Sequence, residues 1–190
     1  MAVSFEEVLS FWIDDVGPDG WYKSDPELDE TIRSRFMDTW LDAAAGKLDH
    51  WAFCPRGMLA FLIVTDQFPR NMFRDDPRAF FTDAIALEAA SRAIARDFDQ
   101  EVNEPERQFF LLPFMHSESL TMQERGVRLF MMRMSPENQN LLHARAHRKV
   151  IRDFGRFPYR NSALGRSSTS SELAYLDAGG YRHTLTALAS

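Results

Sequence analysis

Residues 25–46 read DPELDETIRSRFMDTWLDAAAG. Asp25-Pro26 is typical of a helix start, because an aspartate side chain accepts hydrogen bonds from the first free N–H groups and proline fits the first helical position. Gly46 is typical of a helix end. Between these residues the apolar side chains recur at helical spacing, at Leu28, Ile32, Phe36, Trp40 and Ala43. The stretch therefore predicts an amphipathic α-helix that buries one face.

Similar helix signals recur along the whole chain. Ser4 with Glu7, and Thr169 with Glu172, form the capping-box pattern that begins a helix. Other helix starts are indicated at Pro55, Asp76-Pro77, Asn103 to Pro105, Ser119 and Ser135-Pro136-Glu137. Residues 58–67 are apolar almost all round, which is typical of a helix at the centre of a core. Since no alternating run predicts a strand, we expect an all-α protein of about eight helices packed as antiparallel pairs.

The domain organisation follows from the lack of a dividing linker. No stretch rich in proline, glycine and serine separates one part of the chain from another, so we expect a single helical domain over residues 1–190. The helix that starts near Ser135 should end at Gly155. From Gly179 onward the sequence predicts little fixed structure, and we expect residues 178–190 to form a loose tail.

Composition excludes several classes of protein. The hydrophobic fraction of 45% is ample for a folded core. No apolar run approaches the roughly 20 residues that cross a bilayer, and the first residues, MAVSFEEVLSFW, lack the basic start of a signal peptide. Cys54 is the single cysteine, so no internal disulfide can form, and we expect a cytoplasmic location. The net charge of −6 argues against a general nucleic-acid partner.

Charge is unevenly spread along the chain. Residues 1–50 carry 12 acids against 4 bases, whereas residues 145–166 carry seven bases against Asp153 alone. One interpretation is that the basic segment packs near the acidic half of the chain. The other is an anion site, because arginine presents a planar fork that suits carboxylate or phosphate.

Two turns resemble each other. The sequence DQFPRN at residues 66–71 follows one expected helix, and GRFPYRN at residues 155–161 follows another. Proline stops a helix and the phenylalanine can pin the turn, so that the next side chains are held outward on a stiff loop. If both turns line one pocket, the ligand-binding residues are Arg70, Asn71, Arg156, Arg160 and Asn161, joined by Arg166. The alternative is that both turns are helix stops whose polar side chains cap nearby carbonyl groups.

Histidines supply the remaining candidates. In the His116-Ser117-Glu118 turn, His116 can act as an acid or base near neutral pH and Glu118 can pair with an arginine. With Asp66 these two are the candidate catalytic residues. His147 lies four residues after His143, on the same helical face, and is expected near the same pocket. A third metal ligand is not identifiable, so we expect no metal and no cofactor.

Four motifs occur together in this chain. They are F-W…W-Y…D-x-x-L-D-x-x-I (Phe11 to Ile32), D-Q-F-P-R-N (Asp66 to Asn71), H-S-E (His116 to Glu118) and H-x-x-V-I-x-x-F-G-R-F-P-Y-R-N-x-x-L-G-R (His147 to Arg166). In this order they resemble the bacterial family labelled domain of unknown function 924. The resemblance implies antiparallel helix pairs stacked as a tetratricopeptide-repeat-like right-handed superhelix. It implies no activity, substrate or cofactor, and the family motif has histidine where this chain has Tyr159.

Three functions compete at this point. The first is binding of a small anionic molecule in a pocket formed by the two Phe-Pro turns and the His-Ser-Glu turn, with hydrolysis or acid–base catalysis as its enzymatic form. The second is a protein- or peptide-binding helical-repeat module that presents a groove to an acidic peptide or other partner; Met131, Met132 and Met134 are candidates for its contact surface. The third, nucleic-acid binding through residues 145–166, is disfavoured by few interleaved aromatic residues.

Overall fold

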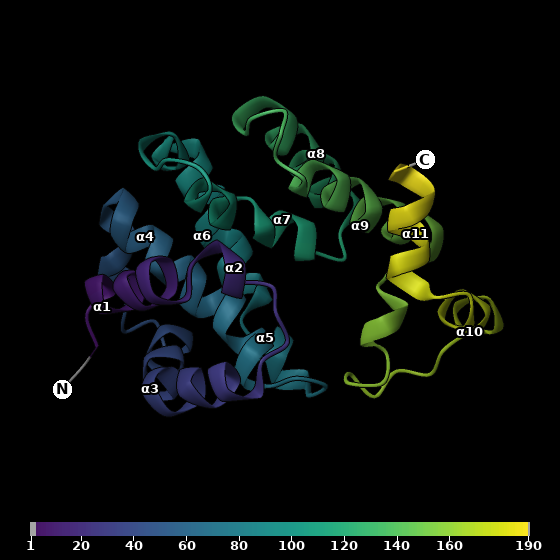
Figure 1. Ribbon diagram of the computed structural model, residues 1–190, viewed down its shortest axis with the longest axis horizontal. Coiled ribbons are helices and arrows are strands. Elements are labelled where there is room, and N and C mark those ends of the chain that lie inside the picture. The colour runs from purple at the N-terminus through teal and green to yellow at the C-terminus, as the bar shows by residue number, and fades with distance from the viewer. Residues whose placement is uncertain (1–2, 190) are drawn as a thin grey trace. The chain divides into compact units, whose positions relative to one another are not determined.

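The computed structural model describes residues 3–189, and within them every regular element is helical. The expectation of an all-α protein is therefore confirmed. The chain forms two compact units, Met1–Pro113 and Phe114–Ser190. The single domain over residues 1–190 stays a prediction, and each unit has its own set of helices (Figure 1).

The first unit begins with α1 (Phe5–Leu9). Its capping box is formed as predicted, because Ser4 Oγ accepts from the Glu7 N–H at 3.2 Å and Glu7 Oε2 accepts from the Ser4 N–H at 2.9 Å. The helix continues as a π-helical segment, η1 (Ser10–Val16), and ends in the short α2 (Gly17–Gly20).

Helix α3 (Pro26–Ala44) matches the stretch that indicates the fold most clearly. Asp25 Oδ1 accepts from the N–H groups of Glu27 and Leu28 at 2.9 and 3.3 Å. The face that bears Ile32, Phe36 and Trp40 is buried, and Gly46 adopts a left-handed conformation with φ of 75° just beyond the helix end. The amphipathic helix expected from the sequence is thus confirmed.

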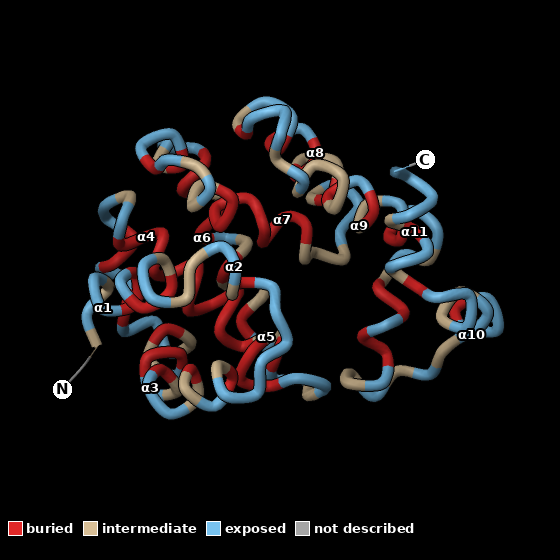
Figure 2. Tube along the Cα trace, in the orientation of Figure 1, coloured by how far each residue is buried: buried red, intermediate tan, exposed pale blue. Residues whose placement is uncertain are grey.

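The centre of the first unit is the continuous helical run of α4 (Pro55–Leu62), η3 (Ile63–Gln67) and α5 (Phe68–Met72). Every residue from Gly57 to Pro69 is buried, and Figure 2 shows this run in red. Close packing begins at Gly57, where a Cβ atom would stand 2.3 Å from the Trp51 carbonyl oxygen. The prediction of a buried central helix at residues 58–67 is confirmed.

The helix expected after Asp76-Pro77 forms in two pieces. A 3₁₀ turn, η4 (Pro77–Phe80), comes first, and α6 (Asp83–Ala95) begins only after Thr82. Thr82 is buried there, and its hydroxyl donates to the Thr65 carbonyl at 2.6 Å and accepts from Trp40 Nε1 at 3.1 Å. The remaining elements of this unit are the 3₁₀ turns η2 (Asp49–Phe53), η5 (Phe98–Glu101) and η6 (Glu106–Phe110).

Helix α7 (Leu112–His116) crosses the boundary between the units. The second unit then contains α8 (Leu120–Arg133), α9 (Asn140–Phe154), η7 (Pro158–Arg160), α10 (Ser170–Asp177) and α11 (Gly180–Ala189). Helices α8 and α9 pack against each other, and α11 packs against α9. The expected helix start at Ser135 is wrong by five residues, because Asn138 Oδ1 accepts from the Asn140 N–H and begins α9 there.

The C-terminal segment differs from the expected loose tail. Residues 180–189 form α11, and Tyr181 on this helix lies against His143 and His147 of α9, with ring centroids 6.1 and 4.7 Å apart. Packing of this face onto α9 stabilises the helix. None of the helices within residues 3–189 is long and apolar enough to cross a membrane.

Candidate functional site

The His-Ser-Glu turn and the second Phe-Pro turn meet in the second unit. Glu118 Oε1 accepts from the Phe157 N–H at 2.8 Å. The same carboxylate accepts from Arg166, with Nη1 to Oε2 at 2.8 Å and Nη2 to Oε1 at 3.0 Å. Glu118 therefore pairs with an arginine as the sequence predicts, and the bidentate pair fixes the turn that carries Phe157.

Arg166 and Asn161 extend this hydrogen-bonded network, and we call Glu118, Asn161 and Arg166 together the clasp. Arg166 Nε donates to Asn161 Oδ1 at 2.9 Å, and Nη2 donates to the Phe157 carbonyl at 3.1 Å. Asn161 Nδ2 donates in turn to Ser168 Oγ at 3.0 Å. Burial raises the pKa of Glu118, but the hydrogen bonds from Arg166 and the Phe157 N–H outweigh it and hold that pKa below its ordinary value. These residues shape the turn rather than face a ligand.

Arg156 is also engaged within the protein. Its Nε and Nη2 donate to the two oxygens of Glu172 at 2.6 and 2.8 Å, and Nη2 donates to the Ser167 carbonyl at 2.9 Å. Glu172 at the same time caps α10 by accepting from the Thr169 N–H at 2.7 Å. The hydrogen bonds from Arg156 lower the pKa of Glu172 to about 2. For Arg156 the structural interpretation of the turn is therefore the better one.

His147 lies against the pinned turn. Its imidazole meets the Phe157 ring edge-on at 5.4 Å and the His116 ring at 6.2 Å between centroids. Nδ1 lies 2.9 Å from the His143 carbonyl oxygen, so Nδ1 carries the proton and Nε2 is left as an acceptor. Burial, followed by the nearby His116, lowers the pKa of His147 to about 3. The imidazole is therefore neutral at physiological pH.

Tyr181 closes the other side of this group of rings. Its hydroxyl lies 2.7 Å from His143 Nδ1. Burial lowers the pKa of His143 and raises the pKa of Tyr181, so the neutral phenol donates to the neutral imidazole. Sequence reasoning missed Tyr181 because it lay in the supposed tail. The spacing of Tyr181, Leu185 and Leu188 was the helical signal that could have found it.

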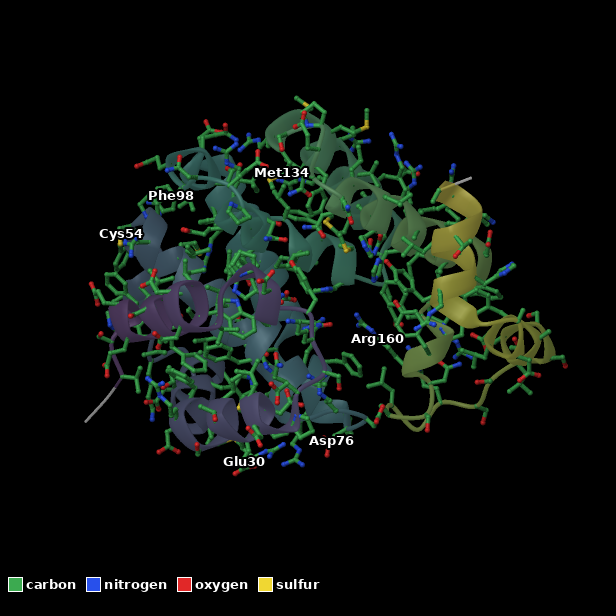
Figure 3. The ribbon with its side chains drawn as sticks, viewed as in Figure 1. Glu30, Cys54, Asp76, Phe98, Met134 and Arg160 are labelled. Carbon is green, nitrogen blue, oxygen red and sulfur yellow. The ribbon has the colours of Figure 1, made fainter. Side chains whose placement is uncertain are left out.

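Arg160 supplies the positive charge of the group. Only 7% of the residue is exposed, and its guanidinium lies 4.6 Å from the centre of the Phe157 ring; Figure 3 labels it. Its charge contributes to lowering the pKa values of both His147 and Glu118, so the guanidinium lies close enough to interact with both groups. We call His116, His147, Phe157, Arg160 and Tyr181 the imidazole cluster.

The first Phe-Pro turn belongs to the other unit. Arg70 there lies between two carboxylates, with Nη1 at 3.3 Å from Asp66 Oδ1 and Nη2 at 2.9 Å from Asp83 Oδ1. Asp66 is buried and also accepts from Gln67 Nε2 at 2.5 Å. Both residues thus have structural partners, and Asn71 Nδ2 likewise donates to the buried Asp29 at 2.8 Å.

Seven of the ten candidate residues share the second unit: His116, Glu118, His147, Arg156, Arg160, Asn161 and Arg166. The other three, Asp66, Arg70 and Asn71, belong to the first unit. A single pocket formed by both Phe-Pro turns therefore stays a prediction, whereas the contact between the His-Ser-Glu turn and the second Phe-Pro turn is present.

Comparisons with known proteins agree with these motifs. The family model described as "Bacterial protein of unknown function (DUF924)" matches residues 8–180. Among solved structures, the chain is similar to the protein of unknown function ATU0120 from Agrobacterium tumefaciens, with 38% sequence identity over 92% of this chain and 97% of that chain, and a TM-score of 0.87. None of the curated proteins matches this chain. Neither description assigns an activity.

Proposed function

This chain belongs to the DUF924 family of bacterial proteins of unknown function. From the residues of the imidazole cluster we propose that it binds a small oxyanion there. The observation that carries the proposal is the position of Arg160, a largely buried residue whose charge acts on His147, the imidazole that packs against His116. A buried arginine fork is suited to carboxylate or phosphate oxygens.

The charge of the second unit supports an anionic ligand. Residues 114–190 carry 11 bases against 6 acids, whereas residues 1–113 carry 11 bases against 22 acids. A locally positive surface on an acidic protein raises the local concentration of small anions and speeds their association. The clasp of Glu118, Arg166 and Asn161 would hold Arg160 in place before the ligand arrives, which reduces the entropy lost on binding.

Binding is better supported than catalysis. A base whose pKa is about 3 is too weak to remove a proton efficiently near neutral pH, so we assign His147 Nε2 the role of hydrogen-bond acceptor. Asp66 and Glu118 are paired with Arg70 and Arg166. In a hydrolase or other acid–base enzyme of this design, His116 would carry the proton. The proposed binding needs no cofactor. A cytoplasmic location is proposed with it, because the single cysteine, Cys54, allows no internal disulfide.

Thermal unfolding tests this function. The full chain would be melted with phosphate, simple carboxylates, hydroxy acids and nucleotides in turn, since a ligand that binds only the folded state raises the melting temperature. At least one oxyanion is expected to raise it, and Arg160→Gln to abolish the shift. Arg145→Gln, at an exposed position of α9, is the matched control and should keep the shift. No shift with any compound, or equal shifts in both variants, would contradict the proposal.

The second candidate function is recognition of a peptide. Met131 and Met132 on α8 are 58% and 80% exposed, and flexible methionine side chains are common on surfaces that adapt to a partner. Met134 is buried and belongs to the core. A partner that co-purifies with the protein and is lost in Met131→Gln with Met132→Gln, but not in Leu173→Gln, would favour this function over the first.

A further inference from the structure

The first unit contains a groove that the proposed function does not use. It has a volume of about 620 Å³, which is within the range of about 300–1,000 Å³ typical of small-molecule sites. Its walls come from α3, from the end of α5 and from the residues that follow α5. Lining it are Pro26, Asp29, Arg33, Met37, Asn71, Met72, Phe73, Arg74, Asp76 and Arg78. The groove lies within a single unit, so its geometry does not depend on the other unit.

One wall of the groove is apolar. Met37 is half-buried, and Met72 and Phe73 are almost fully buried at 1% and 4% exposure. Pro26, the first residue of α3, extends the same wall. Flexible methionine side chains fit ligands of irregular shape. The apolar surface that a ligand can reach on this wall is therefore mainly that of Pro26 and Met37, with Met72 and Phe73 buried behind it, and it suits a hydrocarbon chain.

The other wall carries three guanidinium groups, each paired with a carboxylate. Arg33 donates to Glu30 and, through Nε at 3.2 Å, to the Met72 carbonyl, so its Nε and Nη1 donors already have acceptors. Figure 3 labels Glu30 on α3 and Asp76 just ahead of η4, the carboxylates that pair with Arg33 and Arg78.

Arg74 and Arg78 keep donors for a ligand. Arg74 uses Nε and Nη2 on Asp29, with Nη2 to Oδ1 at 2.8 Å. Arg78 uses Nε and Nη2 on Asp76, at 2.9 and 2.8 Å, and lies 4.4 Å from the centre of the Phe73 ring. In both residues Nη1 has no hydrogen-bond acceptor among residues 3–189. The two guanidinium groups line the same groove and each keeps one donor group without an acceptor, so both can donate to the oxygens of a ligand head group.

We propose that this groove binds an organic monocarboxylate, with the carboxylate at Arg74 and Arg78 and the hydrocarbon part on Pro26 and Met37, next to the buried Met72 and Phe73. Each of the three arginines is paired with a carboxylate, Glu30, Asp29 or Asp76, so the groove has little excess positive charge and suits a ligand with a single negative charge. The other acidic residues of the first unit have little effect on a ligand in the groove where they are more than about 8 Å away, because salt screens exposed charges beyond that distance. A dianionic phosphate would be opposed by Asp29 and Asp76, which lie beside the same guanidinium groups.

Methionine methyl NMR on the full chain tests this site directly. Acetate, butyrate and octanoate would be titrated separately, with octanamide as the uncharged counterpart of octanoate. The signals of Met37 and Met72 report on the groove, those of Met131 and Met132 on α8 serve as the reference, and Met37→Leu assigns one of them. Since each buried methylene strengthens binding roughly fourfold, octanoate in a partly open groove is expected to bind at least about tenfold more tightly than butyrate, with octanamide far weaker.

The charge requirement is tested by Arg78→Gln, which removes a guanidinium from an exposed pair and should not disturb folding. It is expected to weaken octanoate binding about fivefold. Arg92→Gln, which removes the exposed Arg92–Glu88 pair on α6, is the matched control and should bind as the unchanged protein does. Equal affinity of acid and amide, movement of the Met131 and Met132 signals alone, or equal affinity in the two variants would overturn the proposal. These readouts leave the Arg160 site untouched, so either proposal can fail without the other.

Discussion

Acidification should destabilise the protein through one partly buried imidazole. His147 is surrounded by Phe157, Tyr181 and His116, and burial, followed by the nearby His116, lowers its pKa from 6.5 to about 3. The unfolded chain therefore takes up a proton on this residue near pH 6.5, whereas the folded protein resists protonation until about pH 3. Between these values the unfolded state binds more protons, so stability falls as the pH falls.

The size of the effect follows from the two pKa values. Each pH unit between them changes the free energy of unfolding by about 1.4 kcal/mol per titrating group. The free energy of unfolding is therefore about 2 kcal/mol lower at pH 5 than at pH 8, because pH 5 lies one and a half units below the pKa of the unfolded chain. No contribution is expected above about pH 7.5, where both states hold the neutral imidazole.

The assay compares the protein with His147→Gln. Glutamine stays neutral throughout, and its amide can still donate to the His143 carbonyl that now accepts from His147 Nδ1. Urea unfolding followed by circular dichroism at pH 8, 6.5 and 5 gives the free energy of unfolding for each protein. The difference between the two proteins should change by about 2 kcal/mol from pH 8 to pH 5, while other titrating groups cancel.

A matched control separates burial from the mere presence of a histidine. His183 is exposed on α11, and His183→Gln should follow the pH dependence of the unchanged protein. Parallel pH profiles for His147→Gln and the unchanged protein would refute the reasoning. A directly measured pKa near 6.5 for His147 would refute it equally, because the imidazole would then be open to water.

Three further predictions concern stability. Glu118→Gln weakens the hydrogen bonds that fix the second Phe-Pro turn and should lower the free energy of unfolding in urea by about 2–3 kcal/mol. An unchanged free energy would show that the turn is stable without the Glu118 carboxylate. Thr169→Ala removes the cap of α10 and should cost about 1 kcal/mol, measured as faster amide hydrogen exchange in that helix, whereas unchanged exchange would contradict the capping role. Gly57→Ala forces a Cβ against the Trp51 carbonyl and should cost about 1–3 kcal/mol, seen as a lower midpoint of tryptophan fluorescence; an unchanged midpoint would mean that the backbone yields freely.

Local signals in the sequence predicted most helix boundaries. The capping boxes at Ser4 and Thr169, the aspartate cap at Asp25 and the stop at Gly155 are all present. Each depends on hydrogen bonds within a few residues, so the pattern alone contains the information. Helix α11 was missed because its stability comes from Tyr181 packing on α9, a contact between residues far apart in the chain.

The candidate site was predicted in part. The sequence indicated that Glu118 pairs with an arginine, but several arginines were equally plausible partners, and only the fold places Arg166 within reach. Arg156 looked available because its acidic partner, Glu172, is more than ten residues away along the chain. The same is true of Asp83 for Arg70, although the second partner of Arg70, Asp66, is only four residues away. Ion pairs of this kind depend on tertiary distances. Sequence reasoning therefore found the right turns and overestimated how many of their charges face a ligand.

The proposed oxyanion site is tested most directly by imidazole NMR. With His116 and His147 assigned by substitution, the oxyanion that raises the melting temperature would be titrated into the protein at constant pH. The ring signals of these two residues should shift together and saturably, and those of His50 and His183, on exposed parts of the chain, should stay in place. A raised melting temperature with both cluster signals unmoved would show that the anion binds elsewhere and that Arg160 does not form its site.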